Sequence, residues 1–407
     1  MEKDSPIIGL VALDIEKSGG VKTVAEFIFR AICEFSGYRV KIISLASSAS
    51  DANSSRLSSC KTWLSCPKVT ISQWSGIECF HVGANWSEFE FQRYRPRRVL
   101  SELISDCDLI QVVAGSPAVA LSCVGLGKPV LLQVATRAIV ERRMRASNDK
   151  GLAAIWRRAM TKITDRLDEK AIRDVDYVMV ENPWMLEYCT AIGHQSSTSV
   201  IFAPPGVDIN MFSPVMSGRK LGGRAGYILS VGRWDDPRKN VNFLLEAYRL
   251  VVMGHSDVPD LVLVGSTGPS GDFWEKVVRY SLRHRVRFIE KPSWPDLITL
   301  YQGATCFALS SDEEGFGMVV IEAMACGVPV VATRCGGPEG IIDHDDDGLL
   351  SPLEDVDAFA ASLQNLCFDL EKNRIMGMRA RIKVENKFSL AVAGQRFIDV
   401  YDNLLKN

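Results

Sequence analysis

Short apolar runs alternate with stretches of helical spacing along most of this chain, and that alternation leaves few folds open. Ile7–Leu13 is an uninterrupted apolar run, Ser18-Gly19-Gly20 follows it, and Val21–Ser36 then carries apolar residues at every third or fourth position. A strand, a glycine loop and a helix in this order are typical of a parallel sheet covered by helices. The predicted fold class is therefore α/β.

Two such series are present. The strands predicted in the first are Val40–Leu45, Leu109–Ala114, Val130–Val134, Tyr177–Val180 and Ser199–Ala203. The strands predicted in the second are Tyr227–Val231, Leu261–Gly265, Val286–Ile289, Ala304–Leu309 and Val328–Thr333. Pro204-Pro205-Gly206 and the Gly-, Ser- and Pro-rich Ser213–Gly223 separate them, and 407 residues exceed the usual size of one core. We expect two Rossmann-like domains in tandem, with ligands bound at the carboxyl ends of the strands.

Composition excludes several classes of protein. The net charge of −2 gives no reason to expect nucleic acid as a partner. Eleven cysteines without a Cys-x-x-Cys pair, and only five histidines, indicate neither a disulfide framework nor a zinc site, so a reducing cytoplasm fits best. The first residues lack the features of a signal peptide. Leu109–Gly127 is uncharged, but Gln111, Ser116 and Pro117 favour a strand, a loop and a helix over a membrane span.

The most specific motif reads Glu314-Gly-Phe-Gly-Met-Val-Val-Ile-Glu322, with two carboxylates eight positions apart. Its glycines break the chain before a helical run, Met318–Cys326, which Gly327 ends. The backbone N–H groups of Phe316–Val319 are therefore expected at a helix N-terminus, where an anion such as a diphosphate is stabilised. Either glutamate alone is typical of an exposed charge. Together with its neighbours, the pair indicates a site for a phosphorylated sugar.

This block closely resembles the E-x7-E motif of retaining glycosyltransferases of family four, the glycosyl transferases group 1, which have the two-domain GT-B fold. The resemblance is specific from about Tyr227 to Leu350 and loose elsewhere. It implies an acceptor-binding domain at 1–205, a nucleotide-sugar-binding domain at 206–386, and a helix at 387–407 that crosses back to the first domain. It also implies that Glu314 holds the sugar hydroxyls and Glu322 the ribose. The donor-binding residues between them are Gly315, Phe316, Gly317, Met318 and Val319.

Two cations follow the first strand of the second series. Arg233 comes directly after Val231-Gly232, and Lys239 stands six residues later, before the helical run Val241–Met253. Basic loop residues are usually solvated, but this pair resembles the family's Gly-Arg…Lys phosphate-binding motif. Arginine and lysine can neutralise a diphosphate leaving group, so we expect Arg233, Lys239 and Glu314 to be the catalytic residues. The resemblance then implies that no metal or other cofactor is required.

Other features are less specific. Gly19 and Gly20 follow the first strand, where glycines also occur for packing reasons, and the resemblance places them opposite the donor diphosphate. Glu290-Lys291-Pro292 stands where the family binds the nucleotide base through its main chain, with glutamate at a place often held by glycine. Lys291 is assigned to the donor site on this basis. The Asp-x-Asp triplets, such as Asp345–Asp347, are interpreted as polar turns rather than metal sites.

The chain departs from its apparent family in the first domain. Many members carry a histidine after one of the strands that correspond to Leu109–Ala114 and Val130–Val134. Here those strands are followed by Gly115-Ser116 and by Ala135-Thr136-Arg137. Thr136 and Arg137 are the candidates for a group that reaches the reacting sugar from the acceptor side.

Thr136–Arg173 holds eleven Lys or Arg against five Asp or Glu, with an apolar helical stripe through it. The stripe comprises Leu152, Ile155, Trp156, Ala159, Met160, Ile163 and Leu167. Arg93, Arg95, Arg97 and Arg98 form a second basic cluster. One interpretation is a surface that meets anionic lipid and a lipid-phosphate acceptor. The other, which we favour, is a helix that packs on the core with a solvated basic face.

The chain is therefore expected to be a retaining glycosyltransferase that moves a sugar from a nucleotide diphosphate sugar to an acceptor hydroxyl. A glycan or lipid-linked acceptor in bacterial surface polysaccharide synthesis is the expected partner, and a cytoplasmic location, peripheral on the inner face of the membrane, fits it. Two alternatives remain open: a nucleotide-sugar epimerase or hydrolase of the same fold, and a non-catalytic protein that binds sugar nucleotides. Release of nucleotide only in the presence of an acceptor would separate the transferase from the hydrolase.

Overall fold

The computed structural model describes residues 5–16, 19–59, 62–63, 66–142, 151–194, 196, 198–215 and 226–406. Ser18, residues 143–150 of the basic segment and residues 216–225 of the proposed linker lie outside these ranges. The chain divides into two compact units. Unit 1 comprises Met1–Pro205 and Ala393–Asn407, and unit 2 comprises Gly206–Val392.

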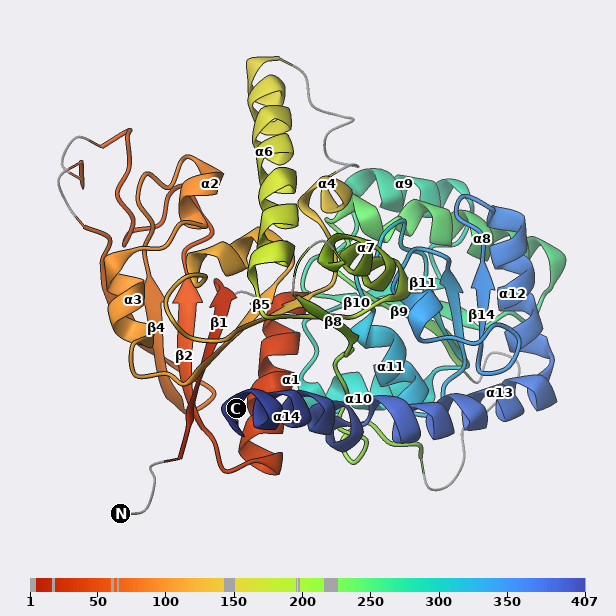
Figure 1. Ribbon diagram of the computed structural model, residues 1–407. Coiled ribbons are helices and arrows are strands. Elements are labelled where there is room, and N and C mark those ends of the chain that lie inside the picture. The colour runs from red at the N-terminus through yellow and green to blue at the C-terminus, as the bar shows by residue number, and fades with distance from the viewer. Residues whose placement is uncertain are drawn as a thin grey trace. The chain divides into compact units, whose positions relative to one another are not determined.

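Unit 1 is built on an eight-stranded sheet with the order β3-β4-β2-β1-β5-β6-β7-β8 (Figure 1). Its strands are β1 (Ile7–Leu13), β2 (Arg39–Leu45), β3 (Val69–Trp74), β4 (Ile77–Val82), β5 (Leu109–Ala114), β6 (Val130–Val134), β7 (Tyr177–Val180) and β8 (Ser199–Phe202). All pairs are parallel except β3 with β4. Its helices are α1 (Gly20–Phe35), α2 (Glu90–Arg93), α3 (Arg98–Ile104), η2 (Pro117–Ser122), α4 (Ala138–Glu141), α6 (Leu152–Asp174) and α7 (Pro183–Gly193). The α/β class is confirmed.

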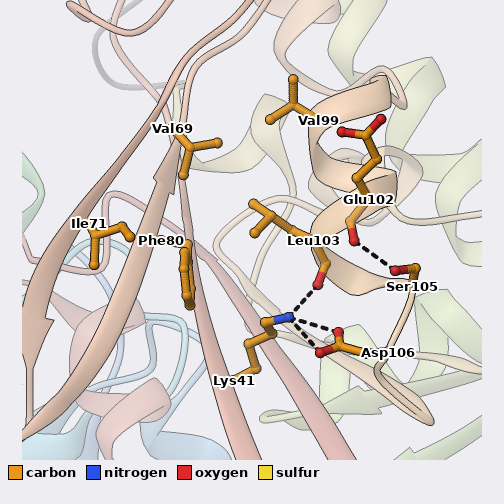
Figure 2. Close-up of a pocket in the computed structure, with 9 residues that line it drawn as sticks. All are labelled: Lys41, Val69, Ile71, Phe80, Val99, Glu102, Leu103, Ser105 and Asp106. Atoms are coloured by element: carbon orange, nitrogen blue, oxygen red, sulfur yellow. Dashed lines mark hydrogen bonds and ion pairs between the residues drawn. The ribbon is translucent and has the colours of Figure 1, made fainter.

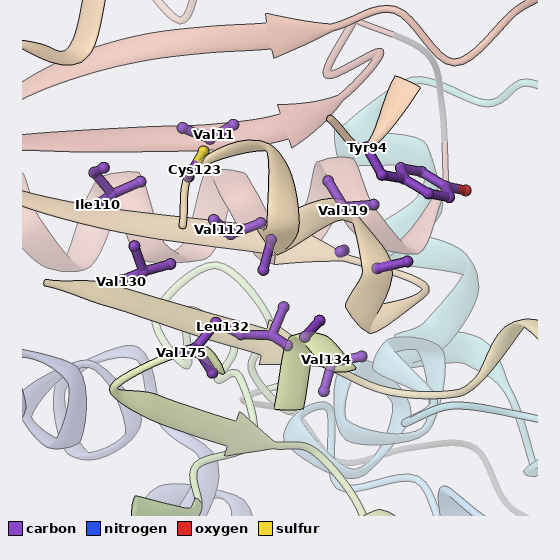
Figure 3. Packing of buried hydrophobic residues seen from close by; sticks show 14 of the residues in the cluster. Val11, Tyr94, Ile110, Val112, Val119, Cys123, Val130, Leu132, Val134 and Val175 are labelled. Carbon is purple, nitrogen blue, oxygen red and sulfur yellow. The ribbon is translucent and has the colours of Figure 1, made fainter. Parts of the chain in front are cut away.

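The core of unit 1 lies around the central strands. Figure 3 shows Val112 of β5 and Leu132 of β6 side by side, with Val119 of η2 packed nearby, and all three side chains are fully buried. Leu109–Gly127 thus forms a strand, a loop and a short helix, which confirms that interpretation. Within the ranges described above, no helix is both long and apolar enough to cross a bilayer.

The last helix, α14 (Leu390–Lys406), begins in unit 2 and completes the core of unit 1. The ring of Phe397 meets that of Phe27 on α1 at 5.5 Å between centroids. Tyr401 donates a 2.8 Å hydrogen bond to the amide oxygen of Gln111 on β5, and both side chains are fully buried. Unit 1 is therefore assembled from both ends of the chain.

Unit 2 is built on a six-stranded, wholly parallel sheet with the order β11-β10-β9-β12-β13-β14. Its strands are β9 (Tyr227–Val231), β10 (Asp260–Gly265), β11 (Val286–Glu290), β12 (Cys306–Leu309), β13 (Val330–Thr333) and β14 (Gly348–Ser351). Its helices are η4 (Pro237–Lys239), α8 (Val241–Gly254), α9 (Gly271–Arg279), α10 (Trp294–Gly303), α11 (Met318–Ala325), η5 (Pro338–Gly340), α12 (Val356–Phe368), α13 (Leu370–Lys383) and the π-helix η6 (Val384–Phe388). Neighbouring residues Ile228 and Leu229 pack in separate apolar clusters because successive side chains of a strand point to opposite faces.

Every strand predicted from an apolar run is present, with ends that differ by at most two residues. The apolar runs do not predict β3, β4 and β14. The hairpin β3–β4 is not predicted because β3 lies at the edge of the sheet and is largely exposed, so its sequence has no continuous apolar run. Ser75 and Gly76 form its turn, with φ angles of 48° and 84° that suit a two-residue hairpin.

Candidate functional site

The predicted donor residues of unit 2 follow the carboxyl ends of its parallel strands, which meet at one edge of the sheet. Arg233 and Lys239 follow β9, Lys291 follows β11, and Glu314 follows β12. The structure brings two of them into direct contact. The Lys239 ammonium donates to the Glu314 carboxylate, although the two residues are 75 positions apart in the chain.

Arg238, which was not among the predicted residues, links the loop after β9 to the loop after β12. Its guanidinium bonds to Asp236 and Glu313, each at 2.7 Å, and its carbonyl accepts from the backbone N–H of Asp312 at 2.7 Å. Burial opposes the ionisation of Asp236, but its bonds to Arg238 and the charge of Arg238 outweigh this and lower its pKa to about 2. The chain around Lys239 is thereby held against the loop that carries Glu314.

The loop after β13 holds Glu314 from the other side. The Glu314 N–H donates to the Cys335 carbonyl at 3.0 Å, and the Gly337 N–H donates to the Glu314 carbonyl at 2.8 Å. A Cβ at Gly337 would lie 2.2 Å from the carbonyl oxygen of Phe316, so only glycine fits there. The adjacent pair Gly336-Gly337, separated by two residues from the end of a strand, was the signal in the sequence for this close approach.

Helix α11 begins as predicted, directly after the glycines of the motif. Gly317 is the N-cap, with a φ of 103° that favours glycine, and the helix ends before Gly327, whose φ is 70°. The first turn of a helix leaves backbone N–H groups without an intrahelical acceptor. Met318 and Val319 are in this first turn, and a Cβ at the N-cap Gly317 would lie 3.7 Å from Cγ of Glu314, so the helix begins beside the Glu314 side chain.

Two predicted cations are less tightly held. The Arg233 side chain is 45% exposed and lies 3.4 Å from the Asp236 carboxylate. The Lys291 ammonium lies 3.1 Å from Glu290 and is exposed. The Lys291 N–H donates to the Gly265 carbonyl at 2.9 Å, so this main-chain donor is already used within the sheet edge. Whether each contacts a donor stays a prediction.

Glu322 lies in the second turn of α11 with only 7% of its surface exposed. Its Oε2 accepts a 2.7 Å hydrogen bond from the Tyr301 hydroxyl. Burial raises the pKa of Glu322 to about 7, and the bond from Tyr301 counteracts part of this effect. A glutamate buried to this extent is unusual.

The remaining predicted residues lie in unit 1. Gly19 is the N-cap of α1, and a Cβ at Gly19 or Gly20 would meet nothing within 4 Å. Thr136 is buried. The Arg137 guanidinium bonds to Asp165 at 2.7 Å and stacks on the Tyr188 ring at 3.9 Å from its centroid. Arg137 is thus held by its own unit, and the acceptor-side role of Thr136 and Arg137 stays a prediction.

Unit 1 also holds two buried carboxylates that the sequence analysis did not select. Asp168 of α6 accepts from the Ser116 hydroxyl and from the backbone N–H groups of Ala118 and Ala138, so it ties the loops after β5 and β6 to α6. Glu181, directly after β7, accepts a 3.0 Å bond from Gln133. Burial raises the pKa of Asp168 to about 6 and that of Glu181 to about 7. Neither stands in a motif, so no sequence pattern would have found them.

The Asp-x-Asp triplet that ends at Asp347 forms a turn, as interpreted, with Asp345 at a φ of 68°. Asp347 is paired with Lys383 at 2.5 Å. Among the described residues no three His, Cys, Asp or Glu side chains gather as metal ligands would.

The basic segment agrees only in part with the favoured interpretation, that of a helix packed on the core. In α6 the side chains of Ile155 and Trp156 are 63% and 47% exposed, so the expectation that this stripe packs on the core is wrong for these two residues, whereas Met160 is buried. The Trp156 ring contacts Phe89 at 5.5 Å between centroids. The second basic cluster is also not one exposed patch, because Arg97 is buried. Arg93 donates to the carbonyls of Ser47 and Ser87.

A pocket of about 510 Å³ in unit 1 contains none of the predicted residues. Figure 2 shows Ile71 and Phe80 of the strands on one side and Leu103 of α3 on the other. Its cation, Lys41, bonds to Asp106 at 2.7 Å and to the Leu103 carbonyl at 2.8 Å. The Lys41 ammonium is therefore already bonded within the pocket.

Comparison with protein families finds a match to the model described as Glycosyl transferases group 1, over residues 225–369. The D-inositol 3-phosphate glycosyltransferase of Saccharomonospora viridis is 27% identical over 249 residues, which cover 58% of this chain and 57% of the relative. The O-antigen chain mannosyltransferase B of Escherichia coli is 37% identical over 139 residues, which cover 34% of this chain and 36% of the relative. The chain spans about half the length of the curated relatives it matches.

Solved structures resemble the whole chain. A sucrose-phosphate synthase from Thermosynechococcus elongatus is 20% identical with a TM-score of 0.70, over 98% of this chain and 99% of that one. HepE of Anabaena, in complex with UDP-glucose, is 17% identical with a TM-score of 0.67, over 97% of this chain and 99% of HepE. These likenesses confirm the GT-B fold.

Proposed function

We propose that the chain is a retaining glycosyltransferase of the glycosyl transferases group 1, whose family model matches residues 225–369, and that its donor is a nucleotide diphosphate sugar. The contact between Lys239 and Glu314 carries the proposal. It joins a cation suited to the diphosphate with a carboxylate suited to sugar hydroxyls, beside the first turn of α11. Each of these features is ordinary alone, but together they match the charges and hydroxyl groups of one ligand.

In this proposal the donor displaces the internal pair. The diphosphate takes the place of Glu314 at the Lys239 ammonium, with Arg233 as the second cation and the N–H groups of Met318 and Val319 as further donors. Glu314 is then free to accept hydrogen bonds from the sugar hydroxyls. The two cations and the helix N-terminus supply the positive charge that the leaving group needs, so we propose that no metal is required.

The proposed chemistry keeps the configuration of the sugar without a covalent intermediate. The bond between the anomeric carbon and the diphosphate oxygen breaks, and the acceptor hydroxyl forms its bond on the same face. The acceptor proton passes to an oxygen of the leaving phosphate. Retaining hydrolases instead place a carboxylate nucleophile about 5 Å from the acid across the scissile bond. Mass spectrometry that trapped a glycosyl adduct on Glu314 would contradict this mechanism.

We propose a glycan or a lipid-linked acceptor. An O-antigen mannosyltransferase among the relatives and a UDP-glucose complex among the similar structures support this class of acceptor and donor. Ten cysteines without a disulfide, at the described positions, fit a reducing compartment and a cytoplasmic site of action.

The same proposal includes peripheral contact with an anionic membrane. The exposed Ile155 and Trp156 stand next to Arg157 and Arg158, whose side chains are also exposed. An apolar pair beside cations is the composition of an interfacial helix. Co-sedimentation with phosphatidylglycerol vesicles should weaken for Trp156→Ala. Trp294→Ala, which removes a tryptophan of unit 2 that is 57% exposed, should leave this binding unchanged. Equal binding by both variants would remove the membrane from the proposal.

The test of function is release of nucleotide from UDP-glucose, GDP-mannose and ADP-glucose, with and without a mixture of lipid-linked and glycan acceptors. A transferase releases nucleotide only when an acceptor is present. Release without acceptor would indicate a hydrolase, and binding without any release would indicate a protein that only binds sugar nucleotides.

A further inference from the structure

Tyr301 of α10 is fully buried in unit 2 and has little freedom to move. Its ring meets Phe212 at 5.9 Å and Phe307 at 5.8 Å between centroids. Aromatic neighbours on two sides fix the plane of the ring, and a phenol hydroxyl lies in that plane. The position of the Tyr301 hydroxyl is therefore set by core packing.

That hydroxyl donates to Oε2 of Glu322 at 2.7 Å. Within the described residues this is the one hydrogen bond to the Glu322 side chain, so Oε1 has no protein partner there. Burying a carboxylate with a single donor is unfavourable. A carboxylate with one oxygen anchored and the other unused is arranged to accept a hydrogen bond from a ligand.

We propose that Tyr301 is a positioning residue for nucleotide binding, which holds the Glu322 carboxylate so that Oε1 accepts from the ribose hydroxyls of the donor. This inference rests on the proposed function, because it requires a nucleotide in the site. Tyr301 itself does not touch the nucleotide. It acts by fixing the direction of Oε1 and by supplying the donor that keeps Oε2 occupied.

The hydrogen bond also affects the charge of Glu322. An ionised carboxylate accepts from both hydroxyls of a ribose diol, whereas a protonated one has given up part of that capacity. Among the described residues, Tyr301 on α10 is bonded to it, Cys326 on α11 lies close enough to affect Tyr301, and Arg381 on α13 donates to the Ala325 carbonyl of α11. The Tyr301 bond favours the ionised form, so its removal raises the pKa of Glu322 above about 7.

The experiment compares Tyr301→Phe with Tyr248→Phe by isothermal titration at pH 8. Tyr248 is equally buried in unit 2, and its hydroxyl bonds to the Pro259 carbonyl at 3.0 Å, so the control removes the same group. The ligands are UDP, GDP and ADP, and then the 2′,3′-dideoxy form of whichever binds wild type most tightly.

Tyr301→Phe should weaken the binding of the ribonucleotide about tenfold, as expected for loss of a hydrogen bond to a charged group. The affinity for the dideoxy nucleotide should stay within about twofold of the wild-type value, because that ligand lacks the ribose hydroxyls that Glu322 is proposed to bind. Tyr248→Phe should change neither. Equal weakening of both ligands by Tyr301→Phe, or no weakening of the ribonucleotide, would overturn the inference.

A second readout uses the intact nucleotide sugar, whose diphosphate does not titrate near neutrality. Its affinity should fall below about pH 7 for wild type, and at a higher pH for Tyr301→Phe. Glu322→Gln, which keeps an acceptor for Tyr301, should make affinity independent of pH in this range. Unchanged pH profiles would also overturn the inference. Wild type that binds none of the nucleotides would instead contradict the proposed function, and this inference with it.

Discussion

Single residues in this protein show how burial changes the chemistry of a carboxylate. Glu314 is partly exposed and paired with a lysine, whereas Glu181 and Glu322 are buried with one neutral donor each. Burial raises the pKa of both Glu181 and Glu322 to about 7. A glutamate with a raised pKa is most favourable to folding when it is protonated. Its contribution is complete below pH 4.5 and is lost as pH rises through 7.

Glu181→Gln should therefore stabilise the protein at pH 8 but not at pH 4.5. The amide oxygen can accept from Gln133 as the carboxylate does, and the amide N–H can donate to the Gln133 Oε1, which is buried without a partner. The gain at pH 8 is on the order of 3 kcal/mol, from a pKa displaced from 4.5 to about 7. Urea unfolding at both pH values measures it.

Glu26→Gln is the matched control, because Glu26 lies on α1 of the same unit and is 37% exposed. Glu26→Gln should change the free energy of unfolding only slightly, and by the same amount at pH 8 and at pH 4.5. A Glu181→Gln protein that is less stable than wild type at pH 8 would show that the ionised carboxylate is required by the fold.

At the scale of elements, two loops hold the loop before α11 in place. The loop after β9 reaches it through Arg238, and the loop after β13 through Gly337. Glu314 and the N–H groups of the first turn are thus positioned by neighbours on both sides of β12. The proposed anion site is formed by three adjacent loops rather than by one motif.

Gly337→Ala should disturb this arrangement, because its Cβ would lie 2.2 Å from the Phe316 carbonyl oxygen. We expect a loss of about 1–3 kcal/mol in stability and weaker nucleotide binding, as the backbone of Phe316–Val319 shifts. Gly271→Ala, at the start of α9 with nothing within 4 Å of its Cβ, should leave binding unchanged. Thermal unfolding and titration calorimetry measure both effects. Normal binding by Gly337→Ala would mean that the loop can relax.

The parts of the fold and site that could be predicted from the sequence are those that leave a local pattern in it. Strands buried on both faces, such as β5 and β12, appear in the sequence as unbroken apolar runs, and α11 appears through the glycines around it. The edge strand β3 and the partners Tyr301 and Arg238 leave no such pattern. Their roles arise from contacts between segments far apart in the chain, and local periodicity does not encode those.

At the scale of the whole molecule, the chain forms two units with separate cores, and its last helix belongs mainly to the first. Phe397 of α14 is fully buried against Phe27. Nucleotide binding is proposed for unit 2, whose core does not include this contact. Stability of unit 1 and binding by unit 2 should therefore respond to different substitutions.

Phe397→Ala should destabilise unit 1 by about 3–5 kcal/mol, the usual effect of truncating a buried phenylalanine. Nucleotide affinity at 15 °C, where the variant is still folded, should stay within about twofold of wild type. Hydrogen exchange should increase in α1 and β5 but not in α11. Faster exchange in α11 to the same extent would show that the two units unfold together.

The central claim is that unit 2 binds a nucleotide diphosphate sugar through Lys239 and its neighbours. Titration calorimetry of UDP-glucose, GDP-mannose and ADP-glucose against wild type, Lys239→Ala and Arg249→Ala tests it directly. Arg249 is a partly exposed cation of α8 in the same unit. At least one donor should bind wild type, with affinity reduced about 10- to 100-fold by Lys239→Ala and unchanged by Arg249→Ala. Binding of no donor to wild type, or equal binding by all three proteins, would contradict it.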